Sequence, residues 1–303
     1  MKLKLNKSNL TYRKLKLSDY HQFKKLFYHS FKKKISYDFF KWRYFNDSHS
    51  FCYGAFESSR LIANVGMFSI KLNNSNHERL FSRHSSMVLE KYRGDGVFSD
   101  LLSRVKKIIS KKVRLVVMWP NKNNFSNFGI NKKKIIEKKF YLYKTFSRSN
   151  LLKVRKFFNI DRLINLKYFI KSEDSLFFKD LNYFKNRYLS YQKHEYFIDK
   201  FEYKKIKSFF ILKINKDGRD SNYVIVDHFG SKKIKSKHFS NLVENQKKKI
   251  VFLSQKKMNK PNIKFLNNLY FKIGFIKGYS QKEKKYFLKK EIFLGDTDIF
   301  IAT

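Results

Sequence analysis

The most constraining feature of this 303-residue sequence is a tight glycine turn set between two regular elements. A short apolar run, Met87-Val88-Leu89, predicts a strand before the turn Arg93-Gly94-Asp95-Gly96. After the turn, apolar residues recur at spacings of three and four, which predicts a helix. These residues are Val97, Leu101, Leu102, Val105, Ile108 and Ile109. Strand, glycine turn and helix in this order present backbone N–H groups and the positive helix end to a phosphate, and Arg93 adds a charged donor.

The residues around the turn predict further helices and strands in a regular order. Alternating apolar residues indicate strands, and spacings of three and four indicate helices. Ser18 or Asp19 can cap the first helix, and the segment Glu57-Ser58-Ser59-Arg60 predicts a hairpin turn. The predicted order is strand 9–17, helix from residue 18 or 19, helix 37–44, strands 51–56, 60–70 and 81–89, the helix after the glycine turn, strand 113–119 and strand 135–146.

The glycine turn resembles the acyl-CoA-binding motif of the GNAT (GCN5-related) N-acyltransferases, Arg/Gln-x-x-Gly-x-Gly/Ala. Here the motif stands as Arg93-Gly94-Asp95-Gly96-Val97-Phe98, with Phe98 where a small residue is usual. The predicted order of elements is also similar to the GNAT order. The resemblance implies an α/β (α+β) fold, with a mixed, mostly antiparallel sheet flanked by helices. It further implies that Val88, Leu89 and the six motif residues bind acetyl-CoA or another acyl-CoA.

A second part of the resemblance concerns the segment Trp119-Pro120-Asn121-Lys122-Asn123-Asn124. In GNAT proteins the strand after the pyrophosphate helix diverges from its neighbour, and the gap admits the pantetheine arm. The resemblance implies that Asn121 and Asn124 contact this arm, since an amide side chain can both donate and accept hydrogen bonds. An ordinary asparagine-rich turn is the alternative interpretation. Phe128 and Asn131 stand where the family often has a tyrosine that acts as general acid, so no general acid is carried over.

The family's reaction needs a group that takes a proton from the attacking amine. We consider His84, on the strand before the turn, and Glu57, at the hairpin turn, as candidate bases. An imidazole titrates near neutral pH, although a structural hydrogen bond is an equally good explanation for His84. Cys52, the single cysteine, has no histidine pattern beside it and is interpreted as a small core residue. We expect no metal, no disulfide and a reducing compartment.

The second half of the sequence echoes the first. Phe40-Lys41-Trp42-Arg43-Tyr44-Phe45 recurs as Phe184-Lys185-Asn186-Arg187-Tyr188-Leu189, an offset of 144 residues (184 minus 40). Leu269–Phe275 resembles the end of a GNAT unit, where a glycine ends a helix and a phenylalanine begins a strand. We therefore expect two GNAT-like halves, an acyl-CoA-binding domain over residues 1–150 and a degenerate one over 151–303, with 154–169 as a helical connector. Phe229-Gly230-Ser231-Lys232-Lys233 is a poorer phosphate cradle, which predicts one acyl-CoA site per chain.

The net charge of +44 allows two interpretations. It can indicate a nucleic-acid partner or an anionic surface. However, lysines are spread through the whole chain and only three alanines occur (Ala55, Ala63 and Ala302), as in a protein encoded by AT-rich DNA. A dedicated nucleic-acid surface would concentrate the basic residues. Nucleic acid is therefore a possible partner that we do not favour.

These patterns favour an acyl-CoA-dependent N-acyltransferase that acts on the amine of a small molecule, such as an amino sugar or a surface-polysaccharide precursor. Acetyl-CoA is the expected donor, so the transferred group would not be an aminoacyl group. The alternatives are a basic nucleic-acid-binding protein and a tandem GNAT-type aminoacyl transferase that uses aminoacyl-tRNA. The N-terminus has no secretory pattern, and no run of about 18 apolar residues occurs. We expect a cytoplasmic protein.

Overall fold

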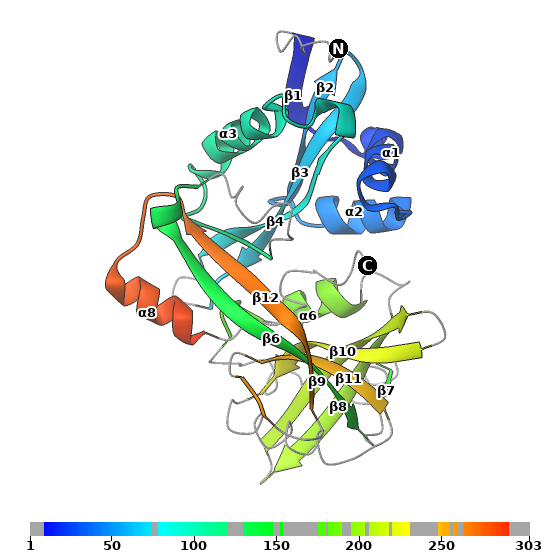
Figure 1. Ribbon diagram of the computed structural model, residues 1–303, viewed down its shortest axis with the longest axis vertical. Coiled ribbons are helices and arrows are strands. Elements are labelled where there is room, and N and C mark those ends of the chain that lie inside the picture. Colours follow the sequence, from blue (N-terminus) through cyan, green and yellow to red (C-terminus); the bar gives the residue numbers. More distant parts are fainter. Residues whose placement is uncertain are drawn as a thin grey trace. The chain divides into compact units, whose positions relative to one another are not determined.

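The computed structural model shows two compact units (Figure 1). It describes residues 9–73, 78–119, 130–147, 152–153, 175–179, 181–189, 195–203, 206–217, 220–230, 248–254, 257–259 and 263–290. Unit 1 comprises Met1–Lys71, Glu78–Ile136 and Lys272–Tyr279, and unit 2 comprises Leu72–His77, Glu137–Phe271 and Ser280–Thr303. The chain thus changes unit after Ile136 and returns to unit 1 at Lys272. A domain boundary at residue 150 stays a prediction.

The sheet of unit 1 is mostly antiparallel, as expected for the fold class. Its strands follow the spatial order β1-β2-β3-β4-β5-β12. They are β1 (Leu10–Lys14), β2 (Phe51–Glu57), β3 (Arg60–Lys71), β4 (Arg79–Val88), β5 (Leu115–Met118) and the last four residues of β12 (Lys264–Phe275). The pair β4–β5 is parallel, and the other pairs are antiparallel. The predicted hairpin forms with Ser58 and Ser59 as its turn.

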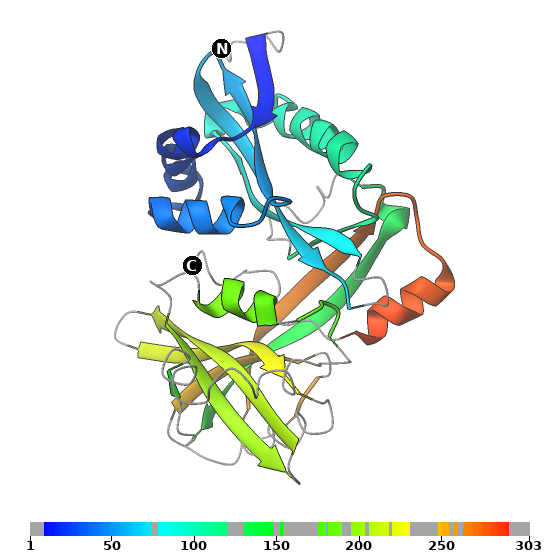
Figure 2. The same ribbon diagram turned by 180° about the vertical axis from the view of Figure 1, so that it is seen from behind.

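Helices cover both faces of this sheet, which explains its continuous apolar strands. α1 (Tyr20–Phe31) and α2 (Tyr37–Phe45) lie on one face, and α3 (Val97–Ile109) lies on the other (Figures 1 and 2). Residues 61–67 of β3 are therefore all buried, as in a strand covered on both faces. Helix α3 buries the face that its spacing predicts, through Val97, Leu101, Leu102, Val105 and Ile109. Short 3-10 turns η2 (Leu17–Asp19), η3 (Glu90–Tyr92) and η5 (Lys132–Lys134) connect the elements.

The helix start near Asp19 shows how a capping residue can serve another element. Asp19 occupies the N-cap position of α1, as predicted, but makes no side-chain cap bond to that helix. Its carboxylate instead accepts two hydrogen bonds from Arg13, at 2.7 and 2.8 Å, and one from the backbone N–H of Lys16. The bond from Arg13 is the main reason that the pKa of Asp19 lies below its usual value. The acid therefore ties β1 to the start of α1.

Unit 2 repeats part of the same topology. Its sheet order is β12-β6-β11-β10-β9-β8-β7. The strands are β6 (Ile135–Ser147), β7 (Leu152–Lys153), β8 (Tyr196–Tyr203), β9 (Ile206–Asp217), β10 (Asp220–Phe229), β11 (Lys248–Ser254) and the earlier part of β12. Its described helices are α6 (Leu181–Phe184), which continues as the π-helical turn η7 (Lys185–Leu189), and α8 (Gln281–Lys289).

The sequence echo falls on equivalent elements in the two units. Helix α2 covers residues 37–45, and α6 with η7 covers residues 181–189, the same positions 144 residues later. Each is followed by three antiparallel strands, β2-β3-β4 or β8-β9-β10. The third strand then pairs in parallel with a fourth, β5 or β11, and that fourth strand pairs antiparallel with a fifth. Two GNAT-like halves stay a proposal, which this repeated pairing supports.

A buried ionic cluster holds the third of these strands in unit 2. Asp227 of β10 is fully buried and forms an ion pair with Lys179, whose side chain is also buried. The hydroxyl of Tyr188 donates to Oδ2 of Asp227, and the hydroxyl of Tyr183 donates to the same oxygen at 3.3 Å. A β-bulge in β10 lies between Ile225 and Asp227. We call Lys179, Tyr183, Tyr188 and Asp227 the unit 2 clamp.

One expectation about the C-terminal region was wrong. Gly274 does not end a helix, because Lys264–Phe275 is one continuous strand, β12. Its C-terminal half contains Tyr270, Phe271, Ile273 and Phe275, aromatic and β-branched residues that favour an extended conformation. Gly274 lies opposite Val116 of β5 inside the ladder. The predicted connector over 154–169 lies outside the residues that the structure describes.

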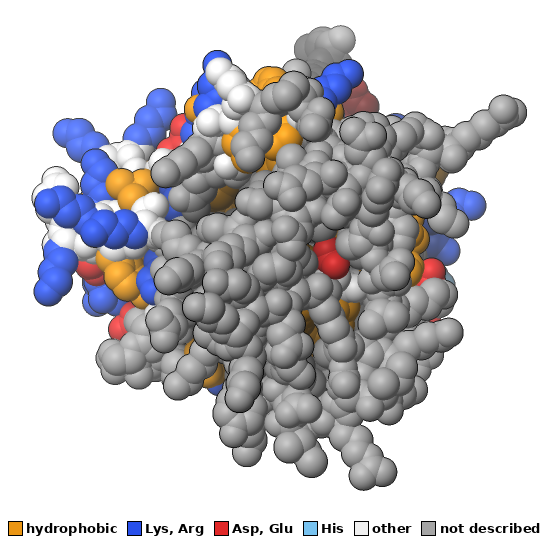
Figure 3. Space-filling view, turned by 90° about the horizontal axis from the view of Figure 1, so that it is seen from below, with side chains coloured by type: hydrophobic (Ala, Val, Ile, Leu, Met, Phe, Trp, Pro, Cys, Tyr) orange, Lys and Arg blue, Asp and Glu red, His pale blue; other side chains and the backbone are white. Residues whose placement is uncertain are grey.

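The described surface and helices carry two further observations. In the view of Figure 3, Lys and Arg side chains are more widespread than Asp and Glu side chains among the residues that are coloured. Among the described helices, none is long and apolar enough to cross a membrane.

Candidate functional site

The predicted phosphate turn has the conformation that its glycines allow. Beyond β4, the N–H of Leu89 donates to the carbonyl of Ile62 at 2.9 Å, and η3 leads to Arg93. Gly94 and Gly96 have φ values of 93° and 78°, in the left-handed region that favours glycine. Gly96 is the N-cap of α3, and no described side chain caps that end. The first N–H groups of α3 are thus available to an anionic ligand.

Strand β4 has an edge that β5 covers only in part. The registered pairs between the two strands are Phe81 with Val116 and Ser82 with Val117. In the described ladder the registered pairs with β5 end at Ser82, and β4 itself continues to Val88. An uncovered strand edge can pair with an extended ligand that carries amide groups. This is the place at which the resemblance puts a pantetheine arm.

A bulge in β4 lies beside this edge and is held by a helix residue. The pairing shifts between Asn64 opposite Met87 and Gly66 opposite His84, so that Ser85 and Ser86 face one residue of β3. Ser85 has a φ of 45°, which is unusual for a residue with a side chain. Its hydroxyl is hydrogen-bonded to the hydroxyl of Tyr44 from α2. The amide of Asn64 donates to the backbone oxygen of Ser85 at 3.1 Å.

Gly66 makes room for this contact. A Cβ atom at Gly66 would lie 2.8 Å from Cε1 of Tyr44 and 3.3 Å from the carbonyl oxygen of His84. The glycine thus lets the tyrosine ring lie close over β3 and reach the bulge. Burial raises the pKa of Tyr44, which keeps its hydroxyl protonated and able to donate. We call Tyr44, Asn64, Gly66 and Ser85 the unit 1 clamp.

The two candidate bases have different surroundings. His84 is partly exposed on β4, and its ring meets Phe68 edge-on with ring centres 6.5 Å apart. Glu57, at the end of β2, accepts a hydrogen bond from the buried Tyr92 and lies 3.9 Å from the Lys91 ammonium. Glu57 therefore holds η3 in place through one of its oxygens. A role as base stays a prediction for both residues.

The other predicted site residues divide into described and undescribed ones. Val97 is buried at the start of α3, and Asp95 and Phe98 are partly exposed. The guanidinium of Arg83 lies 5.9 Å from the centre of the Phe98 ring, so this large residue packs against β4. Burial lowers the pKa of Arg83 to about 10, so it stays charged at neutral pH. Asn121 and Asn124 lie outside the described residues. Cys52 is fully buried, as expected of a core residue, and burial raises its pKa.

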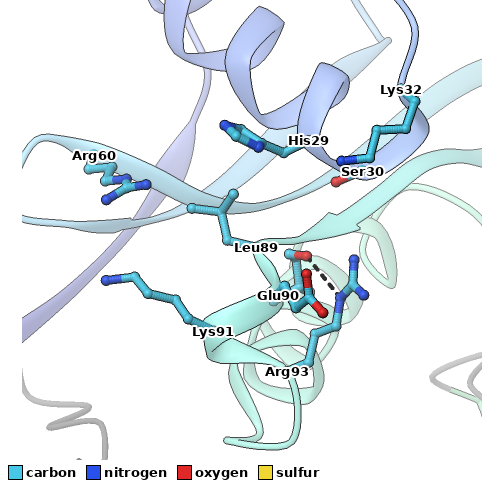
Figure 4. Close-up of a pocket in the computed structure, with 9 residues that line it drawn as sticks. His29, Ser30, Lys32, Arg60, Leu89, Glu90, Lys91 and Arg93 are labelled. Carbon is cyan, nitrogen blue, oxygen red and sulfur yellow. Dashed lines mark hydrogen bonds between the residues drawn. The ribbon is translucent and has the colours of Figure 1, made fainter.

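A basic pocket of about 190 Å³ lies next to the end of β4 (Figure 4). Val88, Leu89 and Arg93, all predicted site residues, contribute to its wall. The remaining lining residues are His29, Ser30, Lys32, Arg60, Glu90 and Lys91. The Nε of Arg93 donates to the carbonyl of Val88 at 3.3 Å, which folds this side chain back along the turn. Figure 4 shows the charged groups of these segments arranged around the pocket.

Sequence reasoning missed the unit 1 clamp and the basic pocket. Tyr44 belongs to the echoed segment, but the echo does not indicate its partner. Gly66, inside an otherwise apolar strand, was an available signal, because such a glycine often marks a bulge or a close approach. The pocket residues His29, Lys32 and Arg60 come from segments far from the glycine turn in sequence, and nothing in a lysine-rich chain distinguishes them.

Comparisons with known proteins agree with this geometry. The family model described as "Acetyltransferase (GNAT) domain" matches residues 11–130, a range that contains all of β1 except Leu10, β2 to β5 and the glycine turn. No curated protein sequence matches the chain. Residues 11–130 of the chain therefore match a GNAT acetyltransferase domain, in agreement with the fold of unit 1. The class of enzyme that this domain defines is the N-acyltransferases.

Solved structures with the same fold extend over most of the chain. A GCN5-related N-acetyltransferase from Anabaena variabilis aligns with a TM-score of 0.62 at 9% identity, covering 88% of this chain and 73% of that one. A conserved protein of unknown function from Enterococcus faecalis gives 0.62 at 14% identity, covering 93% and 75%. A GCN5-related N-acetyltransferase from Kribbella flavida gives 0.56 at 9% identity, covering 89% and 72%. At such identities the likeness establishes the fold.

Proposed function

We propose that the protein is an acyl-CoA-dependent N-acyltransferase that acylates the amine of a small molecule, with acetyl-CoA as its donor. The observation that carries the proposal is the uncapped start of α3, with left-handed Gly94 and Gly96, next to the end of β4 beyond its registered pairs with β5. These two features offer N–H groups to a pyrophosphate and backbone partners to an amide-containing arm. The GNAT domain match covers both features.

Each predicted site residue then has a part in binding or chemistry. An acyl-CoA supplies the activated acyl group. The backbone of Arg93 to Phe98 holds the pyrophosphate, and the backbone of Val88 and Leu89 orients the arm and the acyl carbonyl. Asn121 and Asn124 stay predicted contacts to the arm. The amine nitrogen attacks the thioester carbon, the C–S bond breaks, and the proton lost by the amine goes to His84 or Glu57, directly or through water.

Of the two bases, the geometry favours His84. One oxygen of Glu57 is already engaged by Tyr92, and Lys91 lies nearby, which suits a fixed structural anion. His84 lies on β4, next to the bulge at Ser85 and on the strand whose end holds the acyl group. His84→Ala should therefore lower kcat more than Glu57→Gln does. A larger loss of kcat in Glu57→Gln would assign the base to Glu57 instead.

The decisive test is Gly96→Val with Gly278→Val as its control. Both glycines have positive φ, so a β-branched residue costs about 1–2 kcal/mol of backbone strain at either position. Gly278 also belongs to unit 1 but lies far along the chain from the turn. A thermal-shift titration with CoA should show stabilisation of the wild type and of Gly278→Val, and none of Gly96→Val. Equal stabilisation of all three proteins would remove this turn as the phosphate site.

A calorimetric titration tests the expected number of sites. Gly230, after β10, has a positive φ of 118° but is followed by Ser231-Lys232-Lys233 rather than a second glycine. We therefore expect one CoA per chain, and a stoichiometry of two would contradict this.

A further inference from the structure

The basic pocket beside β4 contains more positive charge than its own residues neutralise. Its wall includes four cationic side chains, Lys32, Arg60, Lys91 and Arg93, and one carboxylate, Glu90. The cations come from the end of α1, the start of β3 and the segment around η3. A concave site lined by one sign of charge concentrates ligands of the opposite sign. The pocket is therefore suited to an anion.

Hydrogen bonds fix the backbone that carries these cations. Gln22 of α1 donates to the carbonyl of Ser59 at 2.6 Å and accepts from the N–H of Leu61 at 2.6 Å, so it brackets Arg60 on both sides. The bond from Tyr92 to Glu57 anchors η3, which contains Lys91, to the end of β2. Such anchoring distinguishes the pocket from scattered surface lysines, because the backbone positions from which these side chains extend are fixed before a ligand arrives.

Ser30 gives an independent sign of a missing partner. Its hydroxyl oxygen is buried and has no hydrogen-bond partner in the described part of the chain. Within the described part of the chain, no ion pair or hydrogen bond involves the charged groups of Lys32 and Arg60. Buried hydroxyl groups in native proteins are nearly always paired, and an unpaired one is unfavourable. An oxyanion in the pocket would give the charged groups of Lys32 and Arg60 a partner.

We propose that this pocket binds a phosphate group carried by the acceptor amine, so that the acceptor is a phosphorylated amine. This rests on the proposed function and specifies the acceptor. The Arg60 guanidinium can form paired hydrogen bonds with phosphate oxygens, and a dianion suits the excess of cations better than a carboxylate does. Val88 and Leu89 line the same pocket, so the rest of the acceptor can extend toward the predicted acyl position.

The test compares a phosphorylated amine with its unphosphorylated counterpart. The full chain is saturated with CoA, which occupies the donor's own phosphate contacts, and is titrated by calorimetry with glucosamine 6-phosphate or glucosamine. We expect the phosphorylated probe to bind at least about tenfold more tightly, the effect of one charged hydrogen bond. Arg60→Gln should remove most of this preference. The control Lys111→Gln removes the same charge from an exposed lysine beyond α3 and should keep the preference.

Three outcomes would overturn the proposal. Equal binding of the two probes, or equal effects of Arg60→Gln and Lys111→Gln, would mean that the pocket selects no phosphate. If Arg60→Gln weakens the binding of CoA but not the binding of dephospho-CoA, the pocket holds the donor's 3′-phosphate instead. Failure of the proposed function looks different, because then CoA does not bind at all. In that case inorganic phosphate, titrated without CoA, should still bind in an Arg60-dependent way if the pocket is an anion site.

Discussion

Unit 1 and unit 2 each hold the third strand of their meander with a tyrosine, and the two tyrosines have different partners. Tyr44 and Tyr188 occupy the same place in the sequence echo, 144 residues apart. Tyr44 bonds the neutral hydroxyl of Ser85, whereas Tyr188 donates to the carboxylate of Asp227, which Lys179 neutralises. A bulge lies at or next to the bonded residue in both strands. The difference shows that the same contact, from a helix tyrosine to the third strand, can use a neutral hydrogen bond or a buried ion pair.

The strand that each clamp holds also continues differently. In unit 1, β4 leads into η3 and the glycine turn that opens α3. In unit 2, β10 ends at Phe229, and Gly230 follows without a second glycine nearby. The unit 1 clamp adds no charged group to β4. The charges near this strand are therefore those of the basic pocket and of bound ligands. We infer that the unit 1 clamp sets the geometry of a binding strand, and that the unit 2 clamp mainly stabilises its unit.

The largest expected effect is on the unit 2 clamp. Asp227→Asn leaves the Lys179 ammonium buried without a counter-charge, which should destabilise unit 2 by about 3–5 kcal/mol. Ser85→Ala in unit 1 removes one neutral hydrogen bond and should cost about 1 kcal/mol. Hydrogen exchange measured at amides of β10 and β4 reports the two units separately. Removing both charges, with Lys179→Met and Asp227→Asn together, should restore much of the stability. Similar losses from Asp227→Asn and Ser85→Ala would contradict the distinction between the clamps.

A smaller effect concerns the glycine that the unit 1 clamp requires. Gly66→Ala places a Cβ against the Tyr44 ring and the backbone of β4, and should cost about 1–3 kcal/mol by overpacking. Tyr44→Leu removes the ring, so the double variant should lose less than the sum of the two single losses. Gly54→Ala is the control, because its new Cβ would meet the movable ends of Leu61 and Leu15 instead. Its effect should add to that of Tyr44→Leu. Additivity for Gly66→Ala as well would show that the glycine does not serve the tyrosine.

The smallest effect is on alkaline stability. Burial raises the pKa of both Tyr44 and Tyr188, and the Asp227 charge raises the pKa of Tyr188 further. A raised pKa in the folded state means that the stabilisation is complete below the unfolded tyrosine value of about 10 and is lost as the pH rises above it. Difference absorbance of tyrosinate between wild type and Tyr188→Phe, or wild type and Tyr44→Phe, locates each ionisation. Both tyrosines should ionise above the unfolded value, and ionisation of either one at that value would contradict the burial assigned to it.

Local patterns predicted most elements of unit 1 because those elements depend on local chemistry. The spacing of apolar residues located α3, and the two serines after Glu57 located the hairpin turn. The clamp could not be predicted, because Tyr44 and Ser85 are 41 residues apart and a neutral hydroxyl pair leaves no pattern in sequence. The sequence of β12 was misinterpreted because Gly274 is the type of residue that often ends a helix. Its pairing with Val116 of β5 cannot be read from the sequence. The binding and catalytic roles of the site residues depend on how a ligand binds. The sequence and the fold therefore support these roles only as proposals.

The return of β12 to unit 1 has a consequence for biosynthesis. Strand β5 ends at Met118, but its antiparallel partner Lys272–Phe275 leaves the ribosome 154 residues later (272 minus 118). At about 5–20 residues per second, the edge of β5 waits roughly 8–30 s for its partner. An open strand edge of this kind can pair with other chains during that time. The nascent chain therefore depends on whatever shields this edge until Lys264–Phe275 is made, and a chain truncated before Lys264 should be recovered mainly as aggregate.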